Sequence, residues 1–463
     1  MAAILQGLAS DGGLLMPEKP LRLAPHQGAY RQMAAQVLTM AFGEDYGEAP
    51  LSDLAEEAYG QGAFDAPEVV PLRPVGPYHV LELFRGPTAS FKDIALGALP
   101  RLMALARQRL MPERQILVLT ATSGDTGSAT MAGFRDIPGI KVIVFYPEHG
   151  VSPVQAAQMQ RMAGDNLRAV AIRGDFDQAQ RGVKHIFQQA DSIAPQLLLS
   201  SANSINIGRL IPQMAYYLSA LNLLDKQARP VFAVPTGNFG DILAGSLALA
   251  ASGREAELIC ATNANSVLDT ALQQGVYDRR RPLIKTLSPS MDILVSSNFE
   301  RALYLACEGD SARLADMMRH LEQDGRLELP PDIRQRLRQR YDSAVCDDAQ
   351  ALRTMGEVFG AHQYLLDPHS AAAWQALDSR LRPRQQGVAL ATASPFKFPE
   401  AALRALRQPV PDEPAEQLQA LSAAAGLPIP RSLEGLFARD ALHEEVIDPQ
   451  QMADYVARRA RTW

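Results

Sequence analysis

Three short apolar runs in the middle of the chain each end in a turn rich in glycine, serine or threonine. Ile116–Thr120 leads into Ala121–Gly127, Val231–Val234 into Pro235–Asp241, and Val388–Ala391 into Thr392–Pro395. Runs of four or five apolar or β-prone residues that stop at turn residues are typical of buried parallel strands. The apolar segments after the first two turns, Ser128–Phe134 and Ile242–Ala250, predict helices.

Strand-like and helix-like segments also alternate through the rest of this region. Further strands are predicted at Val142–Tyr146, Arg168–Ile172 and Leu258–Ala261, and helices at Ser152–Met162 and Asp177–Ala190. This alternation predicts a layered α/β fold. Ligands of such folds bind at the carboxyl ends of the strands, which is where the three turns lie.

The regions outside this alternation have other patterns. Tyr30–Phe42 and Leu51–Tyr59 predict a helical N-terminal cap, the proline-rich Pro67–Pro77 a linker, and the charged Asp310–Met355 a solvated helical insertion. Residues from Pro409 onward are interpreted as a C-terminal appendage. We therefore expect an N-terminal region at 1–77, a first α/β domain at 78–225, a second at 226–408 and an appendage at 409–463.

Composition narrows the class of protein. Of 463 residues, 47% are hydrophobic, which is enough to fill large cores, and 45 Lys and Arg against 51 Asp and Glu give a net charge of −6. A mildly acidic chain without a basic block is a poor binder of nucleic acid or anionic membranes. No apolar run reaches the roughly 18 residues of a membrane span, and the start lacks a basic signal-peptide region. We expect a cytoplasmic protein.

The cysteines and histidines give no sign of a metal site. Cys260, Cys307 and Cys346 form no C-x-x-C pair, and the histidines form no H-E-x-x-H pair. No metal is therefore expected, and a reducing compartment fits the cysteines. His369 is interpreted as a packed loop histidine.

Three segments could carry chemistry. Gly237–Asp241 follows a strand and opens a helix, so its backbone amides could bind a phosphate, although an ordinary tight turn is the alternative. Thr122–Thr126 is a similar turn with hydroxyls that suit a carboxylate, and helix capping is the alternative there. Lys92 lies between Phe91 and Ile94, where partial desolvation would suit Schiff-base chemistry, although a solvated surface residue is the more common role of a single lysine.

Taken together and in order, these motifs resemble the threonine synthase family, pyridoxal phosphate (PLP) enzymes with the tryptophan synthase β-type fold. The resemblance runs over nearly the whole chain. Its motifs are Gly7–Pro17, Glu82–Asp93, Thr120–Gly127, Asn203–Asn206 with Arg209 and Gln213, Pro235–Asp241, Asp367–His369 and Thr392–Phe398. Arg85 and Ser394 stand where many members have histidine, which bears on substrate specificity rather than on PLP binding.

The resemblance implies a role for each motif. Lys92 would link covalently to PLP, and Thr392 would hydrogen-bond the pyridine nitrogen. The cofactor phosphate site would be lined by Gly237, Asn238, Phe239, Gly240 and Asp241. The substrate carboxylate and the ring-oxygen side of the cofactor would face Thr122, Ser123, Gly124, Asp125 and Thr126.

The implied reaction converts O-phospho-L-homoserine and water into L-threonine and phosphate by γ-elimination and β-addition. Its phosphate leaving group needs a clamp, for which Arg209 with Ser204 and Asn206 is the candidate and Lys397 a weaker one. A structural salt bridge is the alternative role for Arg209. A related phospho-lyase that releases phosphate, a 2-oxo acid and ammonia remains open, as do a monomer or a homodimer. A non-catalytic PLP-binding protein is disfavoured because Lys92 is retained.

Overall fold

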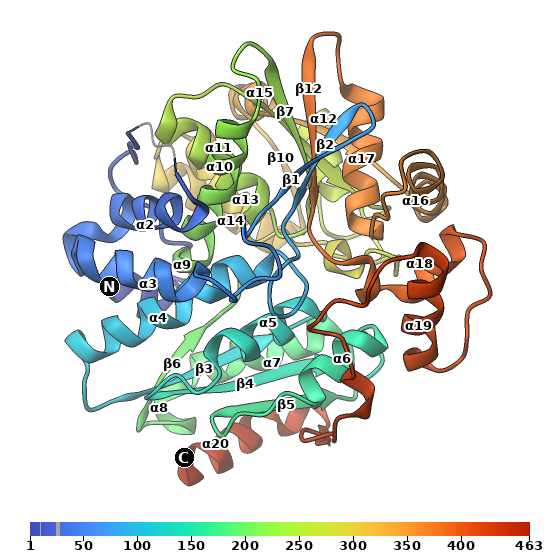
Figure 1. Ribbon diagram of the computed structural model, residues 1–463. Helices are drawn as coiled ribbons and strands as arrows, with labels where there is room; N and C mark the ends of the chain where they lie inside the picture. The colour runs from blue at the N-terminus through green and yellow to red at the C-terminus, as the bar shows by residue number, and fades with distance from the viewer. Residues whose placement is uncertain (10, 25–27) are drawn as a thin grey trace.

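Two largely parallel β-sheets organise the chain, which a computed structural model describes for residues 1–9, 11–24 and 28–463 (Figure 1). The larger sheet has the strand order β1-β2-β12-β7-β8-β11, in which the β1–β2 pair is antiparallel and the other pairs are parallel. Its strands are β1 (Leu72–Val75), β2 (Tyr78–Glu82), β7 (Arg229–Pro235), β8 (Glu257–Thr262), β11 (Tyr341–Val345) and β12 (Gln385–Ala391).

The smaller sheet is parallel throughout and has the order β13-β5-β4-β3-β6. It contains β3 (Gln115–Ala121), β4 (Ile140–Pro147), β5 (Leu167–Ile172), β6 (Leu197–Ser201) and β13 (Val446–Ile447). A separate antiparallel pair joins β9 (Val276–Asp278) to β10 (Arg326–Glu328). The strands predicted from the apolar runs are confirmed as β3, β4, β5, β7, β8 and β12.

Helices cover both sheets, and in Figure 1 the smaller sheet lies below the larger one. The first half of the chain contains α1 (Ala2–Gln6), α2 (Tyr30–Tyr46), α3 (Glu48–Tyr59), α4 (Lys92–Leu110), α5 (Asp125–Phe134), α6 (Pro153–Gln160), α7 (Phe176–Gln188), α8 (Ala190–Ile193), α9 (Ile207–Leu210) and α10 (Met214–Leu223). The second half contains α11 (Gly240–Ser252), α12 (Val267–Gln274), α13 (Phe299–Ala306), α14 (Ser311–Asp324), α15 (Pro331–Arg340), α16 (Asp348–His362), α17 (Pro368–Arg380), α18 (Pro399–Ala405), α19 (Pro414–Ala425) and α20 (Met452–Thr462). The predicted helices after the first two turns are confirmed as α5 and α11.

The predictions for Pro67–Pro77 and Asp310–Met355 each missed a strand of the larger sheet. The expected linker contains β1, which forms a hairpin with β2, and Pro74 is tolerated there because β1 is an edge strand with no further neighbour. The expected helical insertion contains β11, which forms the other edge of the larger sheet. The charged helices α14, α15 and α16 on either side of β11 hide so short a strand in the sequence pattern.

The C-terminal segment joins both sheets. Helix α19 packs on α18 beside the larger sheet, while β13 pairs with β5 and α20 packs on α7. Strand β2, in turn, pairs with β12 of the larger sheet. The division at residues 77, 225 and 408 stays a prediction, although these two pairings cross it.

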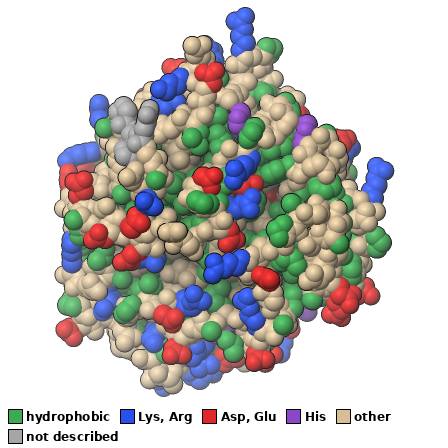
Figure 2. Space-filling model, viewed as in Figure 1, with side chains coloured by type: hydrophobic (Ala, Val, Ile, Leu, Met, Phe, Trp, Pro, Cys, Tyr) green, Lys and Arg blue, Asp and Glu red, His purple; other side chains and the backbone are tan. Residues whose placement is uncertain are grey.

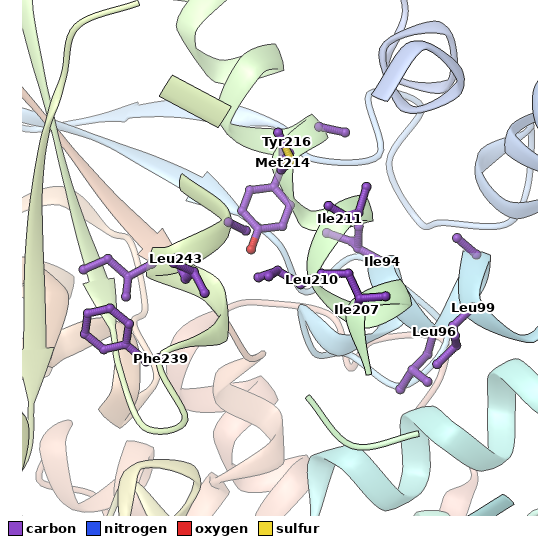
Figure 3. Packing of buried hydrophobic residues seen from close by; sticks show 14 of the residues in the cluster. Ile94, Leu96, Leu99, Ile207, Leu210, Ile211, Met214, Tyr216, Phe239 and Leu243 are labelled. Carbon is purple, nitrogen blue, oxygen red and sulfur yellow. The ribbon is translucent and has the colours of Figure 1, made fainter. Parts of the chain in front are cut away.

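A continuous apolar core connects the helices behind the cleft between the sheets (Figure 3). Ile94 and Leu99 of α4 belong to the same buried cluster as Ile207 of α9 and Phe239 and Leu243 near the start of α11. Burial of such side chains contributes about 1.5–3 kcal/mol each. This core fixes the starts of α4, α9 and α11 relative to one another, and the predicted functional residues lie at those starts.

The surface is mixed in charge. On the face shown in Figure 2, basic and acidic side chains are interspersed and neither sign forms a continuous field. In the described part of the chain, no helix combines the length and the apolar character that crossing a bilayer requires.

Candidate active site

A cavity of about 130 Å³ lies at the carboxyl ends of β3, β7 and β12. Residues of all three predicted turns line it, together with Lys92 and Arg209. A larger concavity of about 830 Å³ opens at the amino ends of β7, β8 and β11, away from every predicted motif. Because ligands of parallel α/β sheets bind at the carboxyl ends of strands, the smaller cavity is the candidate site.

Lys92 is the first residue of α4, and its side chain is 11% exposed. Its Nζ lies 3.4 Å from Oδ2 of Asp125 and 4.6 Å from the ring centre of Phe91. Burial lowers the pKa of Lys92; Asp125 opposes the shift, while Lys397 and Arg209 add to it. The predicted desolvated lysine is therefore present, and a larger fraction of it is neutral amine than of a solvated lysine.

Asp125 opens α5 and lies between two lysines. Its Oδ1 is 2.8 Å from Nζ of Lys397 and accepts a hydrogen bond of 2.7 Å from Nε2 of Gln155. Burial raises the pKa of Asp125, but Lys397 and Lys92 outweigh burial and leave the pKa below its ordinary range. Asp125 is thus a carboxylate, although it also lines the cavity that would receive an anionic substrate.

The turn that contains Asp125 presents donors on its other residues. The hydroxyl oxygen of Thr122 accepts hydrogen bonds of 2.9 Å from the amides of Gly124 and Gly127, which holds the turn in shape. The amides of Ser123, Asp125 and Thr126 donate no hydrogen bond to any described residue. Free amides at the start of a helix form an anion site. Gly124 supports the turn without lining the cavity.

The glycine-rich turn at 237–241 has the features of a phosphate cradle. The amides of Gly237, Asn238 and Phe239 donate to no other residue in the described ranges. A Cβ on Gly237 would lie 2.5 Å from the carbonyl oxygen of Ser290, so only glycine fits beneath that loop. Phe239 adopts a left-handed backbone (φ 61°), and its ring packs on Phe299. A non-glycine residue held at positive φ is a strained conformation that is often found at functional sites.

Asp241 lies in the first turn of α11, and within the described part of the chain no cation is among its hydrogen-bond partners. Its Oδ1 accepts hydrogen bonds from the hydroxyls of Tyr216 at 2.5 Å and Tyr217 at 2.8 Å, while its Oδ2 has no partner among the described residues. Burial raises the pKa of Asp241 to about 6, against the smaller opposing effects of the tyrosines and Lys92.

The candidates for the substrate phosphate clamp differ in whether they line the cavity. Arg209 is 3% exposed, and burial lowers its pKa to about 10. Its Nη1 donates to the carbonyl oxygen of Ala202 at 2.6 Å, its Nε has no partner, and it forms no ion pair within the described chain. The alternative role, a structural salt bridge, is therefore not seen. Ser204 also lines the cavity.

Asn206 does not line the cavity. Its Oδ1 accepts from the amide of Gly208 at 3.0 Å and caps α9, and its Nδ2 donates to the carbonyl oxygens of Ile4 and Ser201. Asn206 thus positions the helix that carries Arg209. A capping role of this kind is the usual one for asparagine before a helix.

Several residues at the cavity were not predicted to belong to the site, among them Ser290 and His369. Ser290 reaches the site from the 3₁₀ turn Pro289–Met291, which lies between α12 and α13, and no sequence motif marks it. His369 lines the cavity as well as packing on Phe398, and its Nε2 accepts a hydrogen bond of 3.3 Å from the amide of Ser290. The Asp367–His369 motif was the available signal for His369, because Asp367 holds the Nδ1 side of the ring at 2.7 Å.

Comparison with known proteins assigns this chain to a family. A family model described as pyridoxal-phosphate dependent enzyme matches residues 70–392, and one described as threonine synthase N terminus matches residues 1–59. A threonine synthase of Pseudomonas aeruginosa is 38% identical over 413 residues, which cover 87% of this chain and 86% of that protein. The chain belongs to the threonine synthase family.

Two further relatives extend the comparison. The human threonine synthase-like 1 protein is 36% identical over 454 residues, and the match covers 92% of this chain but 60% of that protein. The crystal structure of a PLP-bound threonine synthase from Brucella melitensis matches with a TM-score of 0.87 at 34% identity, over 99% of this chain and 96% of that one. The predicted α/β fold and family are thus confirmed, and the chain is a PLP-dependent lyase of the threonine synthase type.

The cavity fits the cofactor of the threonine synthase family. It offers a desolvated lysine, a row of unpartnered amides for a phosphate, and the hydroxyl of Thr392, which makes no hydrogen bond to a described residue. An aldehyde, a phosphate and a ring nitrogen acceptor are the groups by which PLP is held. In the described part of the chain, no group of three or more His, Cys, Asp or Glu side chains could hold a metal ion.

Proposed function

We propose that the protein converts O-phospho-L-homoserine and water into L-threonine and phosphate. The observation that carries this proposal is the presence of two separate phosphate-type sites around one desolvated lysine. The free amides of Gly237–Phe239 form one site, and the unpaired guanidinium of Arg209 forms the other. An enzyme that binds a phosphorylated cofactor and a phosphorylated substrate together requires both.

We assign the cofactor to Lys92, the 237–241 turn and Thr392. PLP supplies, when bound, an electron sink that stabilises negative charge on substrate carbon atoms. The amides of the 237–241 turn hold its phosphate, and Thr392 accepts or donates at the ring nitrogen without adding a charge. Lys92 is placed to take protons from substrate carbons and to return them, because its lowered pKa leaves it neutral more often.

The 122–126 turn is the proposed site of the substrate carboxylate. Its donors are the amides of Ser123, Asp125 and Thr126 and the hydroxyls of Ser123 and Thr126, whereas the Asp125 carboxylate is occupied by Lys397 and Lys92. Charge repulsion makes the side chain of Asp125 unsuitable as a carboxylate ligand. The refined role of Asp125 is therefore toward Lys92 and the cofactor, not the substrate anion.

Arg209 is the proposed clamp for the substrate phosphate, with Ser204 as a hydroxyl donor. A buried guanidinium without a carboxylate partner is costly unless an anion binds it. Asn206 acts indirectly, as the cap of α9. A cytoplasmic location, and a monomer or homodimer, stay predictions.

The test is to incubate the PLP-loaded protein with O-phospho-L-homoserine and to identify every product. L-Threonine with equimolar phosphate is the expected result. Phosphate with a 2-oxo acid and ammonia, and no threonine, would replace the synthase by the phospho-lyase. If no phosphate is released by a loaded protein, the proposed substrate is wrong, and Arg85 and Ser394 become the first positions to examine.

A further inference from the structure

Lys397 is a second lysine at the site, and it is fully buried. It ends a short 3₁₀ turn, Pro395–Lys397, that follows β12, and its side chain is 0% exposed. Its Nζ lies 2.8 Å from Oδ1 of Asp125 and donates to the carbonyl oxygen of Thr88 at 2.9 Å. Lys397 does not line the cavity. The sequence-based alternative that it clamps the substrate phosphate is therefore wrong.

Asp125 is held more tightly by Lys397 than by Lys92. The distance from its carboxylate is 2.8 Å to Lys397 and 3.4 Å to Lys92, and Gln155 donates to the same oxygen that Lys397 contacts. A buried charge is stable only when it is paired and hydrogen-bonded. The Lys397–Asp125 pair meets this condition by itself, so Lys92 is an additional partner, at the second carboxylate oxygen, Oδ2.

The electrostatic consequence falls on Lys92. If Lys397 were absent, Lys92 would be the sole counterion of the Asp125 carboxylate among the described residues, and the carboxylate would hold it as an ammonium ion. With Lys397 present, the attraction is shared and a second positive charge stands nearby. Four other titratable residues lie around the two lysines: Asp93, Arg209, Asp241 and His369. They are the same in every variant considered below.

We propose that Lys397 is a positioning residue that occupies the Asp125 carboxylate and thereby keeps Lys92 available as a neutral amine. The inference rests on the proposed function in one respect, that Lys92 is the reactive lysine. It adds a residue outside the cavity to the groups that set the protonation state of Lys92. A direct consequence is that substitutions at Lys397 and at Asp125 shift the pH midpoint of Lys92 reactivity in opposite directions.

The test is the pH profile of Lys92 reactivity in the full-length protein freed of PLP. Acetic anhydride, a small reagent that acetylates neutral amines, labels the lysines. Mass spectrometry follows the peptide that contains Lys92, and the exposed Lys184 serves as an internal reference. Lys397→Met should move the midpoint for Lys92 to higher pH by about one unit or more. Asp125→Asn should move it to lower pH. The double variant should lie between the two single variants and close to the natural protein.

Three outcomes would overturn the inference. One is an unchanged Lys92 midpoint in a folded Lys397→Met protein, and another is a double variant shifted as far as Lys397→Met. If Lys397→Met does not fold, Asp125→Asn is compared with the double variant, whose midpoint should be the higher of the two because a cation has been removed. Equal midpoints there would be the third contradiction.

A second readout separates this inference from the proposed function. On mixing with PLP near pH 7, the natural protein should develop a visible absorbance band, and Lys397→Met should do so about tenfold more slowly, as expected for a one-unit shift. A natural protein that forms no band would contradict the proposed function, while the labelling midpoints would still decide the role of Lys397.

Discussion

Asp125 and Asp241 occupy matching places at the two ends of the cleft, yet the protein treats them differently. Each follows a strand of a parallel sheet, lies in the first turn of the next helix and is buried. Asp125 faces two lysines, and its pKa is lowered. Asp241 faces two tyrosine hydroxyls, and burial raises its pKa to about 6.

The difference shows that the partners, rather than the motif, set the pKa of a buried carboxyl. Ion pairs with Lys397 and Lys92 exceed the cost of burying Asp125, whereas hydrogen bonds from neutral Tyr216 and Tyr217 do not exceed the cost for Asp241. The end of the cleft that contains Asp125, Lys92 and Lys397, called the lysine end below, is therefore ionic. At the other end, formed by the 237–241 turn and called the glycine-turn end below, Asp241 has a pKa of about 6 and is held by tyrosine hydroxyls instead of lysines.

The largest effect is expected from breaking the lysine end outright. Lys92→Ala should remove covalent attachment of PLP and lower turnover by about a thousandfold or more, because no other amine lines the cavity in the described chain. The glycine-turn end should still bind PLP without a covalent bond. Absorbance, equilibrium dialysis and turnover measure these properties, with exposed Lys184→Ala as the control. Full activity in Lys92→Ala would refute the assignment.

The next effect concerns Arg209, the proposed clamp for the substrate phosphate. Arg209→Gln should raise KM for O-phospho-L-homoserine by about tenfold to a hundredfold, the value of a charge-assisted hydrogen bond, and should change PLP affinity far less. Arg254→Gln is a matched control, because Arg254 also donates to a backbone carbonyl but lies outside the cavity. Equal losses of substrate and PLP affinity would make Arg209 structural.

A smaller effect is expected at the glycine-turn end. Gly237→Ala places a Cβ 2.5 Å from the carbonyl oxygen of Ser290, so the turn or the loop above it must move. PLP affinity should fall about tenfold, in line with the usual cost of overpacking, and Lys92 reactivity should stay unchanged. Gly360→Ala, a helical glycine with open space around it, is the control. Unchanged PLP affinity would separate this turn from the cofactor.

The last prediction concerns the stability of the PLP-free protein instead of binding or turnover, and it compares the two aspartates. The raised pKa of Asp241 means that the folded state binds its proton more tightly, so this group lowers stability as pH rises from about 4 to about 6. Asp241→Asn should remove that loss, worth at most about 3 kcal/mol. The lowered pKa of Asp125 gives the opposite sign, with stability lost as pH falls below about 4.

Denaturant melts across pH 3–8 of the natural protein, Asp241→Asn and Asp125→Asn measure both slopes. The difference between natural protein and Asp241→Asn should appear between pH 4 and 6, and the difference for Asp125→Asn at lower pH. Parallel curves for all three proteins would mean that the two carboxyls are alike after all.

Most of the fold could be predicted from the sequence because local apolar patterns determine where its strands and helices form. The apolar runs ending in glycine or hydroxyl turns became β3, β7 and β12, and their turns line one cavity. Short edge strands were missed, since β1 contains a proline and β11 lies between charged helices, where alternation over a few residues gives little signal.

The site was predicted less completely because side-chain contacts join distant segments. Asn206 belongs to a family motif, and its capping role emerged from the contacts of its side chain with Ile4 and Gly208. Likewise, the pairing of Lys397 with Asp125 brings together the turns after β12 and β3, which lie in different sheets. No spacing in the sequence indicates such a pair, and no motif marks Ser290.

The most direct test of the account is to locate the lysine that carries the cofactor. The PLP-loaded protein is reduced with borohydride, which fixes the cofactor to its lysine, and the labelled peptide is identified by mass spectrometry. We expect the label on Lys92 and none on Lys397, although both lysines contact Asp125. A label on Lys397, or on any lysine outside the cavity, would contradict it.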